Sequence, residues 1–358
     1  MVAVLGAGMW GTTMARLLAA RAPTVLWARR AGLADHLNRR HRNRDYLPTI
    51  ALPESLQATA SLAEALGGAD VIVMALPSHG FREILQSAEP HLTPSAPIVT
   101  LTKGVEQGSL MRMTEIVAEV APNRPYGVLT GPNLAQEVAA GHPTASVISI
   151  VDAAGFDQTT TRELQELFST ETFRVYTNDD LVGCELGGAL KNVIAIASGI
   201  ADGMGFGDNT RAALITRGLA ELTRLGVALG GQPLTFSGLA GLGDLVATCM
   251  SRQSRNRWVG EQLGNGRAVD EITAETRMVA EGIKTSKAAL ELGRRAGVET
   301  PIVEQVVAVL YDGKRATDAL AALMHRETRP ELHGFSPLAP ARAAESGMPA
   351  ADAGTPAG

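Results

Sequence analysis

The chain has 358 residues, 45% of them hydrophobic and 4% aromatic, and a formal net charge of −5 at pH 7. This length exceeds one ordinary core and predicts two domains, and the negative charge argues against nucleic acid or an anionic membrane surface as a partner. Two cysteines, Cys184 and Cys249, cannot build a disulfide scaffold, which fits a reducing cytoplasm.

Neither a targeting segment, a membrane span nor a metal site is expected. A strand pattern begins at Val2, which predicts no leader, and no apolar run looks long enough to cross a bilayer. We therefore expect a cytoplasmic protein without stable membrane insertion. The seven histidines are scattered, and no pair lies at metal-ligand spacing beside a carboxylate or thiol.

The first half of the chain alternates short β-branched runs with stretches of helical length. The expected strands are Val2–Leu5, Thr24–Trp27, Val71–Ala75, Ile98–Leu101, Tyr126–Thr130, Ala145–Val151 and Phe173–Tyr176. The helices expected between them include Met9–Ala20, Phe81–Glu89, Leu110–Val120 and Asp157–Phe168. This alternation predicts an α/β fold with a mainly parallel, doubly wound sheet that helices cover on both faces.

The strand signal ends at about Asn178. Helical patterns follow at 180–201, 209–229, 255–263, 283–296, 301–311 and 315–324. We expect three parts: a nucleotide-binding domain over 1–178, an all-helical substrate and catalytic domain over 179–328, and a tail over 329–358. The tail is rich in Pro, Ala and Gly and has almost nothing to bury, so we expect it to be disordered.

Gly6, Gly8 and Gly11 form a G-x-G-x-x-G motif directly after the first strand and at the start of a helix. In this context Gly6 permits a tight turn, Gly8 lets the backbone approach a pyrophosphate, and Gly11 allows close packing. The free N–H groups of the helix N-terminus face the phosphates. The motif predicts a Rossmann-type dinucleotide site, and no second motif of the flavin type follows it.

Two arginines bear on the choice of dinucleotide. Proteins that bind NAD place an acidic residue at the end of the second strand, where it hydrogen-bonds the ribose 2′-hydroxyl. Here Arg29 and Arg30 follow that strand and no carboxylate does. Guanidinium groups suit a 2′-phosphate, so we expect NADPH to be preferred and NADH to be a second cofactor. Ordinary solvated arginines would give the same pattern.

Lys191 lies near the middle of the long apolar stretch CELGGALKNVIAIASGIAD, on a face shared with Gly188, Ala195 and Ser198. One interpretation is that its amine extends into water along the helix surface. The alternative is that the small neighbours leave room for a ligand, and that a desolvated lysine exchanges a proton near neutral pH.

Further polar residues favour the second interpretation. Lys103 ends an expected strand, at the edge where open parallel sheets bind ligands. Asp244 and Thr248 lie one helical turn apart in the helical part, and Arg255 offers a planar donor to a phosphate or carboxylate. Hydride transfer to a ketone develops negative charge on oxygen and needs a proton donor in cationic surroundings. Together these residues indicate reduction of a small anionic substrate.

Seven motifs in order carry a resemblance that runs from Val2 to about Met324: GAGMWGT, LTKG, GPNLAQE, ELGGALKNVIAIASGIADG, GLAGLGDL, SRNRWVG and VAEGIKT. The chain resembles bacterial NAD(P)-dependent glycerol-3-phosphate dehydrogenases. The resemblance implies reversible NAD(P)H-dependent reduction of dihydroxyacetone phosphate to sn-glycerol 3-phosphate, the backbone precursor of phospholipids. It implies a phosphorylated small-molecule substrate and no nucleic acid, and the sequence leaves a homodimer open.

The resemblance also implies the site residues, with Lys191 as the catalytic proton donor and acceptor. Those implied at the substrate are Lys103, Gly131, Asn133, Lys191, Asp244, Ser254, Arg255 and Asn256. Those implied at the dinucleotide are Gly6, Gly8, Met9, Trp10, Gly11, Arg29, Arg30, Tyr46, Lys103, Ala135, Arg255, Val279 and Glu281. Asn133 departs from the family pattern, which has a small hydroxyl residue there.

Two other functions would share parts of this pattern. A related two-domain reductase, of the β-hydroxyacid dehydrogenase or ketopantoate reductase type, pairs the lysine with an asparagine about one helical turn later. Here position 195 is Ala, and Asn192 directly follows the lysine and points about 100° away. A dinucleotide-sensing protein without catalysis would not need Lys191, Asp244 and Arg255 together.

Overall fold

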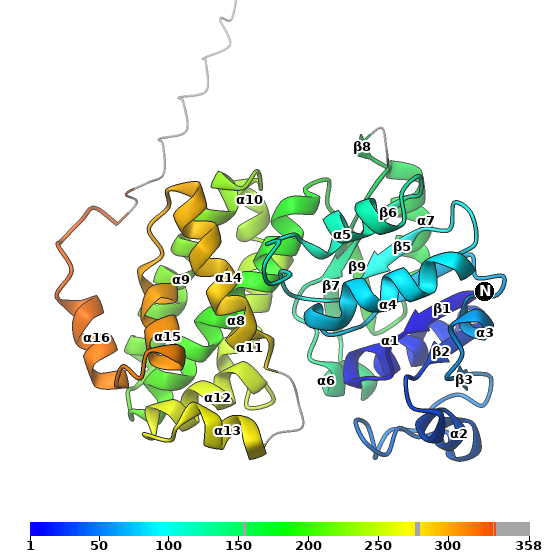
Figure 1. The fold of residues 1–358 in the computed structure, drawn as a ribbon, viewed down its shortest axis with the longest axis horizontal. Coiled ribbons are helices and arrows are strands. Elements are labelled where there is room, and N and C mark those ends of the chain that lie inside the picture. Colours follow the sequence, from blue (N-terminus) through cyan, green and yellow to red (C-terminus); the bar gives the residue numbers. More distant parts are fainter. Residues whose placement is uncertain (153–154, 276–279, 332, 334–358) are drawn as a thin grey trace, which may run out of the picture. The chain divides into compact units, whose positions relative to one another are not determined.

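The computed structural model describes residues 1–152, 155–275, 280–331 and 333. Residues 1–326 form one compact unit, and the described residues after Arg326 lie outside it. Within this unit a sheet with its covering helices comes first along the chain, and a group of helices follows (Figure 1).

The sheet has nine strands in the described residues: β1 (Val2–Leu5), β2 (Thr24–Trp27), β3 (Gln57–Thr59), β4 (Val71–Met74), β5 (Ile98–Thr100), β6 (Tyr126–Thr130), β7 (Thr144–Asp152), β8 (Gly155–Phe156) and β9 (Phe173–Thr177). Their order is β3-β2-β1-β4-β5-β6-β7-β8, and β9 also pairs with β7. The strands from β3 to β6 are parallel to their neighbours, whereas β7 is antiparallel to β6 and β8. The mainly parallel, doubly wound sheet is confirmed.

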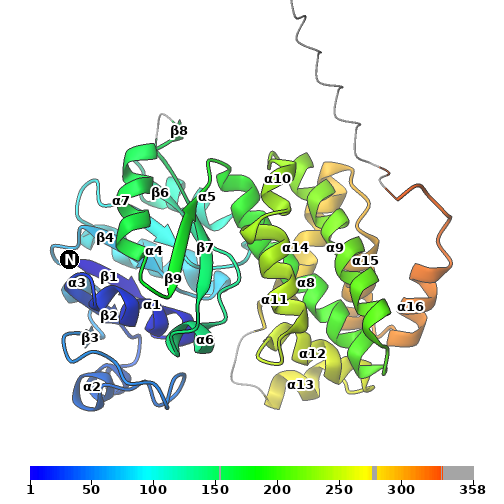
Figure 2. The same cartoon turned by 180° about the vertical axis from the view of Figure 1, so that it is seen from behind.

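Helices cover both faces of this sheet because side chains along each strand alternate in direction. Val2 and Val4 join the core under α1 (Met9–Ala19), α2 (Ala31–Arg40), α6 (Ala135–Ala139) and α7 (Gln158–Phe168). Ala3 and Leu5 join the core under α3 (Leu62–Leu66), α4 (Phe81–Ala88) and α5 (Met113–Val120). Figure 1 shows the side with α4 and α5, and Figure 2 the side with α1 and α7.

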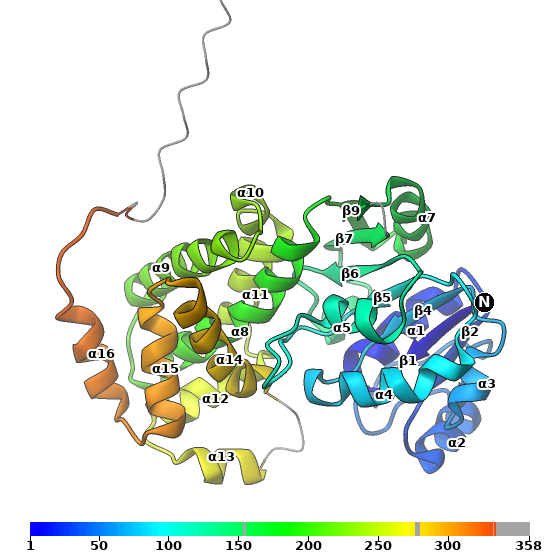
Figure 3. The same cartoon turned by 45° about the horizontal axis from the view of Figure 1, so that its top comes forward.

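The helical part comprises α8 (Leu181–Gly203), α9 (Asp208–Ala228), α10 (Pro233–Phe236), a π-helical turn (Leu239–Gly243), α11 (Asp244–Met250), α12 (Arg255–Gly264), α13 (Val269–Glu275), α14 (Glu281–Ala296), α15 (Pro301–Tyr311) and α16 (Ala316–Met324). Its centre is α8, which contacts α9, α11, α12, α14 and α15 (Figure 3). Nearly every residue of α8 is buried, including Lys191.

Several short elements were not expected from the sequence. These are β3 and β8, the helices α2, α3, α6, α10, α11 and α13, and the π-helical turn. The strand β3 has only three residues at the sheet edge and reads Gln-Ala-Thr, so it has no apolar run to indicate it. The five-residue helices α3 and α6 are too short to show a helical period.

The expectation that no segment could span a membrane needs correction. By length and composition alone, α8 and the segment Pro233–Met250 both qualify. In α8, however, 89% of the most apolar 18-residue stretch is buried inside the fold, as in the central helix of a domain. The segment Pro233–Met250 is divided into α10, the π-helical turn and α11, and it carries the buried Asp244.

Helices α8 and α12 touch backbone to backbone through glycines. A Cβ atom added at Gly199 would lie 1.9 Å from the carbonyl oxygen of Arg257, and one at Gly260 would lie 2.0 Å from that of Ile196. Gly203 and Gly264 continue the same contact one turn further along. This glycine seam fixes the start of α12, residues 254–256, relative to Lys191.

We predict that Gly199→Ala lowers the melting temperature by about 2–10 °C, because overpacking a close contact costs about 1–3 kcal/mol. Gly32→Ala is the matched control: Gly32 is exposed in α2, and its added Cβ would meet open space. There alanine should be neutral or stabilising. Equal melting temperatures for the two variants, measured by calorimetry, would contradict the close contact of α8 and α12 at Gly199.

Candidate active site

The glycine motif has the backbone geometry of a phosphate-binding turn. Gly6 has φ +120°, and a Cβ there would lie 2.4 Å from the carbonyl oxygen of Ala75. A Cβ at Gly11 would lie 1.9 Å from the carbonyl oxygen of Gly6, so α1 packs directly on the turn. A Cβ at Gly8 would instead meet open space. Bare backbone at Gly8 therefore faces room for a ligand.

The N-terminus of α1 is prepared for an anion. The helix begins at Met9 after Gly8, and no side chain caps its free N–H groups. The indole Nε1 of Trp10 is buried without a hydrogen-bond partner among the described residues. Asn43 braces the turn, donating from Nδ2 to Ala7 O (2.9 Å) and to Thr12 Oγ1 (2.8 Å). These features fit the pyrophosphate of a dinucleotide.

A carboxylate from a distant segment lies at the end of β2. No acidic residue follows this strand in the sequence, but the loop after α2 brings Asp45 to Arg30. The Arg30 guanidinium forms an ion pair with Asp45, and Arg44 Nε lies 3.6 Å from the other carboxylate oxygen. The backbone N–H groups of Asp45 and Tyr46 both donate to Asn43 Oδ1 at 3.2 Å, so one asparagine places this loop and the glycine turn together.

The buried carboxylate of Asp244 joins two lysines from different parts of the chain. Its Oδ2 accepts from Lys103 Nζ at 2.6 Å, just beyond β5, and its Oδ1 lies 2.7 Å from Lys191 Nζ on α8. Lys191 Nζ also donates to Thr248 Oγ1, one turn after Asp244 on α11. The Asp244 and Lys191 side chains are only 2% and 6% exposed. Lys191 therefore does not extend into water.

Lys103 is the second amine of this cluster, with 17% of its side chain exposed. It also donates to the carbonyl oxygen of Gly131 at 2.8 Å. Burial lowers the pKa of Lys103 to about 8; the Asp244 carboxylate opposes that shift and the Lys191 charge adds to it. Lys103 can thus lose its charge within the range of ordinary assays.

Arg255, the first residue of α12, adds a cationic side chain to the two lysines. Ser254 caps this helix by accepting from Arg257 N at 3.3 Å. Arg255 is half-buried and makes no hydrogen bond or ion pair with another described residue. Burial lowers the pKa of Arg255, and the nearby Tyr46 opposes that shift. The guanidinium thus lies near a residue of the nucleotide-binding part and is free to bind an anion.

Asn256, expected at the substrate, makes contacts that connect three helices. It donates from Nδ2 to Asn192 Oδ1 (2.9 Å) on α8 and accepts from Gly282 N (3.0 Å) at the start of α14. The side-chain oxygen of Asn192 therefore bonds Asn256 and not Lys191. One N–H of the Asn256 amide stays available for a ligand.

Asn133 has one polar atom engaged and one available. Its Oδ1 accepts from Ser146 Oγ, while Nδ2 is buried without a partner in the described part of the chain. Gly131, two residues earlier, has φ +131°. The Asn133 amide thus presents an unsatisfied donor.

The remaining predicted residues lie at the ends of the parallel strands or beside them. Glu281 accepts from Ser78 N (3.1 Å) and Ser78 Oγ (2.6 Å), in the segment that follows β4. Ala135 begins α6, and its carbonyl oxygen accepts from Thr13 Oγ1 of α1 at 3.2 Å. Val279 falls outside the described residues.

Two residues that shape the site were not expected from the sequence: Asn43 braces the glycine turn, and Ser78 binds Glu281. Thr248, expected beside Asp244 from its one-turn spacing, holds Lys191. The other two contacts join segments 36 and 203 residues apart, and no local pattern indicates them.

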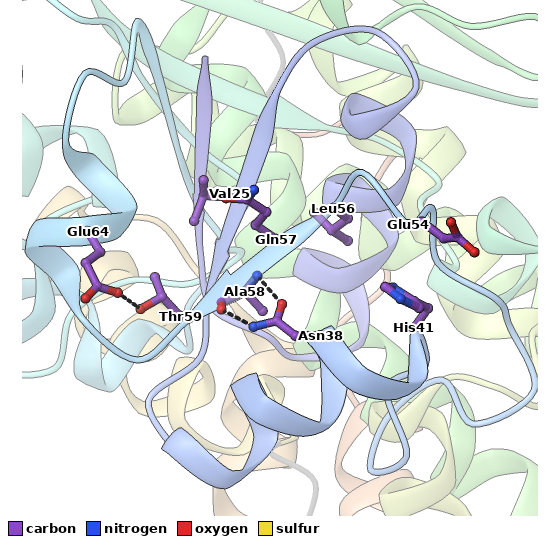
Figure 4. A pocket seen from close by; sticks show the side chains of 9 residues that line it. All are labelled: Val25, Asn38, His41, Glu54, Leu56, Gln57, Ala58, Thr59 and Glu64. Atoms are coloured by element: carbon purple, nitrogen blue, oxygen red, sulfur yellow. Dashed lines mark hydrogen bonds between the residues drawn. The ribbon is translucent and has the colours of Figure 1, made fainter.

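Two surface hollows lie apart from this cluster. One, of about 430 Å³, lies between α2 and β3, where Asn38 bonds the backbone of Ala58 and Thr59 bonds Glu64 (Figure 4). The other, of about 410 Å³, is lined by Tyr176, Gln232 and Leu234 among others. Neither includes a lysine or an arginine, so neither suits an anionic substrate.

Comparisons with known proteins agree with the resemblance. Residues 1–155 match the NAD-dependent glycerol-3-phosphate dehydrogenase N-terminus, and residues 180–321 match the C-terminus of the same family. The chain is 52% identical over 332 residues to glycerol-3-phosphate dehydrogenase (NAD(P)+) 2 of Sphingopyxis alaskensis, an alignment that covers 93% of this chain and 98% of that protein.

Solved structures give the same result. The crystal structure of glycerol-3-phosphate dehydrogenase from Coxiella burnetii is similar with a TM-score of 0.86 and 38% identity, covering 91% of this chain and 98% of that one. A ketopantoate reductase from Ralstonia eutropha has a TM-score of 0.56 at 14% identity, covering 89% and 100%, and shares the fold alone. The chain therefore belongs to the family of NAD-dependent glycerol-3-phosphate dehydrogenases.

Proposed function

We propose that this chain catalyses the reversible reduction of dihydroxyacetone phosphate to sn-glycerol 3-phosphate with NAD(P)H, and so supplies the backbone of phospholipids. The observation that carries the proposal is the Asp244 carboxylate held between Lys103 and Lys191, beside the carboxyl ends of β5 and β6. Ligands of open parallel sheets bind at this edge. The family membership and the near-complete coverage of the relatives add to it.

Lys191 is proposed as the proton donor. An ammonium group has three N–H donors; one is directed to Asp244 and one to Thr248, which leaves the third for the substrate carbonyl oxygen. The bound dinucleotide would supply the hydride. Lys191 would neutralise the charge that develops on oxygen and, in the reverse direction, accept the proton back.

The charge of the site fits a phosphorylated substrate. Two lysines share one carboxylate, so the cluster carries an excess positive charge, and Arg255 adds a guanidinium without a counter-ion among the described residues. We propose that Arg255, with Ser254, Asn256 and the free N–H groups of α12, binds the phosphate. Gly131 and Asn133 line the substrate from the sheet side, and Lys103 contacts both substrate and dinucleotide.

We propose the dinucleotide along the glycine turn and the start of α1, with Arg29, Arg30 and Tyr46 at the adenosine end. Ala135, Arg255, Glu281 and Val279 complete the set implied by the resemblance. The domain limits at 178 and 328, the cytoplasmic location and the homodimer stay predictions. Both cysteines are free and buried, which is compatible with a reducing compartment.

Steady-state oxidation of NADPH tests the function. Dihydroxyacetone phosphate should be the best substrate, ahead of ketopantoate, a 3-oxo acid and free dihydroxyacetone. Charge-assisted hydrogen bonds contribute about 1.5–3 kcal/mol each, so loss of the phosphate should lower kcat/KM by at least about a hundredfold. Comparable kcat/KM for dihydroxyacetone and its phosphate would contradict the proposal, and a preference for ketopantoate would favour the rival reductase.

We predict that kcat/KM for dihydroxyacetone phosphate falls as pH rises through about 8, since the Lys103 pKa of about 8 marks where the free enzyme loses this charge. The loss should appear mainly in KM. Lys103→Arg stays charged throughout the range, so this variant, whatever its absolute rate, should lack the limb near pH 8. An unchanged limb in Lys103→Arg would assign the titration to another group.

Cofactor preference has its own test. Asp45 neutralises part of the charge of Arg30, so Asp45→Asn should raise the ratio of kcat/KM for NADPH to that for NADH. Because the Arg30 side chain is 58% exposed, we expect only about a two- to fivefold increase. Arg30→Ser should lower the same ratio. If neither substitution changes it, the 2′-phosphate does not bind at Arg30.

A further inference from the structure

The helix that carries Lys191 belongs to the helical part, yet its first turns pack on the sheet. Leu181 and Cys184 of α8 share a buried cluster with Val128 of β6 and Val147 of β7. One turn later, a Cβ added at Gly188 would lie 2.6 Å from Thr130 Oγ1 and 3.6 Å from Lys103 Cγ. The start of α8 is therefore in direct contact with the strand ends that border the site.

A buried carboxylate holds this contact. Glu185 of α8, with 6% of its side chain exposed, accepts from Arg112 Nη1 at 2.6 Å and from Thr114 N at 3.0 Å. The Thr114 hydroxyl donates to it as well. Thr114 lies in the first turn of α5, a helix of the sheet part, so Glu185 binds one of the free N–H groups at the α5 N-terminus.

Arg112 is itself held in place. Its backbone N–H donates to Glu115 Oε2 at 2.7 Å, and its Nη2 donates to Glu115 Oε1 at 2.9 Å. The groups that donate to Glu185 are thus fixed by α5 and not by mobile surface groups. We call Glu185, Arg112 and Thr114 the α5–α8 anchor.

Glu185 of the anchor lies six residues before Lys191 on the same unbroken helix. At 1.5 Å per residue, about 9 Å of rigid helix separates the two side chains along the axis. A shift of α8 against α5 would therefore move the Lys191 amine by a similar amount relative to Lys103 and the substrate oxygen. Proton and hydride transfer tolerate little displacement, and an error of about 1 Å can cost about a hundredfold in rate.

We infer that Glu185 is a positioning residue: it anchors α8 to α5 so that Lys191 is held in register with Lys103 and the substrate carbonyl. This inference rests on the proposed function, since it assigns the reaction to Lys191. Buried ion pairs are often replaceable by apolar groups without loss of stability, whereas they can fix one specific arrangement. The anchor therefore has a consequence for catalysis that differs from its consequence for stability.

The chain offers a matched control in Glu221. This buried glutamate of α9 accepts from Ile302 N and Val303 N, both at 3.0 Å, and so caps α15. Both of its partners lie in the helical part, whereas those of Glu185 lie in the sheet part. Burial raises the pKa of both carboxyls, that of Glu221 to about 7. The two residues share burial and capping chemistry and differ in what they connect.

The experiment compares Glu185→Gln with Glu221→Gln by melting temperature, NADPH binding and steady-state kinetics at a temperature where both are folded. Both variants should melt at lower temperature and bind NADPH within about threefold of wild type. Glu185→Gln should lose about 10- to 100-fold in kcat with KM for dihydroxyacetone phosphate changed by less than about threefold. Glu221→Gln should keep kcat within about twofold.

A second substitution shows whether Glu185 acts through Lys191. Lys191→Met alone should lower kcat by at least about a thousandfold, since it removes proton donor and charge. Adding Glu185→Gln to Lys191→Met should lower the residual rate by less than about twofold, because residues that act as a unit are non-additive. Equal kcat in the two glutamine variants, or additive losses with Lys191→Met, would overturn the inference. Absence of wild-type activity on dihydroxyacetone phosphate would instead overturn the proposed function.

Discussion

The arrangement of the site depends on one buried carboxylate between two ammonium groups. In protein surroundings with an effective dielectric constant of about 20, two unit charges 4 Å apart interact by about 4 kcal/mol. Two lysines at one carboxylate repel each other, but each is within hydrogen-bond distance of a different oxygen of Asp244. Because Lys103 follows a strand and Lys191 lies on α8, this balance exists only when the sheet part and the helical part are docked.

The other features of the helical part support this docking. The amide of Asn256 bonds α8 on one side and the N-terminus of α14 on the other. Glu281, the first residue of α14, then binds the segment after β4. Contacts across the two parts therefore occur at α5, at β4 and at β5, and each begins from α8 or from a helix packed on it. Buried polar groups of this kind specify one arrangement more than they add stability.

The sequence predicted the sheet well because its strands are strongly apolar and separated by helical patterns. It missed β3 at the edge, where Gln57 and Thr59 break the apolar run, and it missed α11, which holds Asp244. Asp244 and Thr248 were placed on one helical face from their spacing, a local relation. The contact of Asp244 with Lys103 spans 141 residues, and such a partner follows from the docking of elements, which no spacing encodes. The family resemblance supplied the set of residues, and the structure supplied their partners.

The ion pair at Arg30 shows the same limit. The sequence predicts a phosphate at Arg29 and Arg30 because no acidic residue follows them at the end of β2. Asp45 reaches Arg30 from a loop that Asn43 ties to the glycine turn. The charge at a binding site includes groups from distant segments of the chain, and the local sequence shows only some of them.

The glycine seam between α8 and α12 has a consequence for how the enzyme could be redesigned. With carbonyl oxygens of each helix lying against glycines of the other, neither helix can slide or rotate alone. The separation between Lys191 and Arg255 is thus constant, even if the helical part tilts as a body. A substrate longer or shorter than this distance would have to be accommodated on the sheet side, where Asn133 can be replaced but Gly131, with φ +131°, cannot take a side chain without strain.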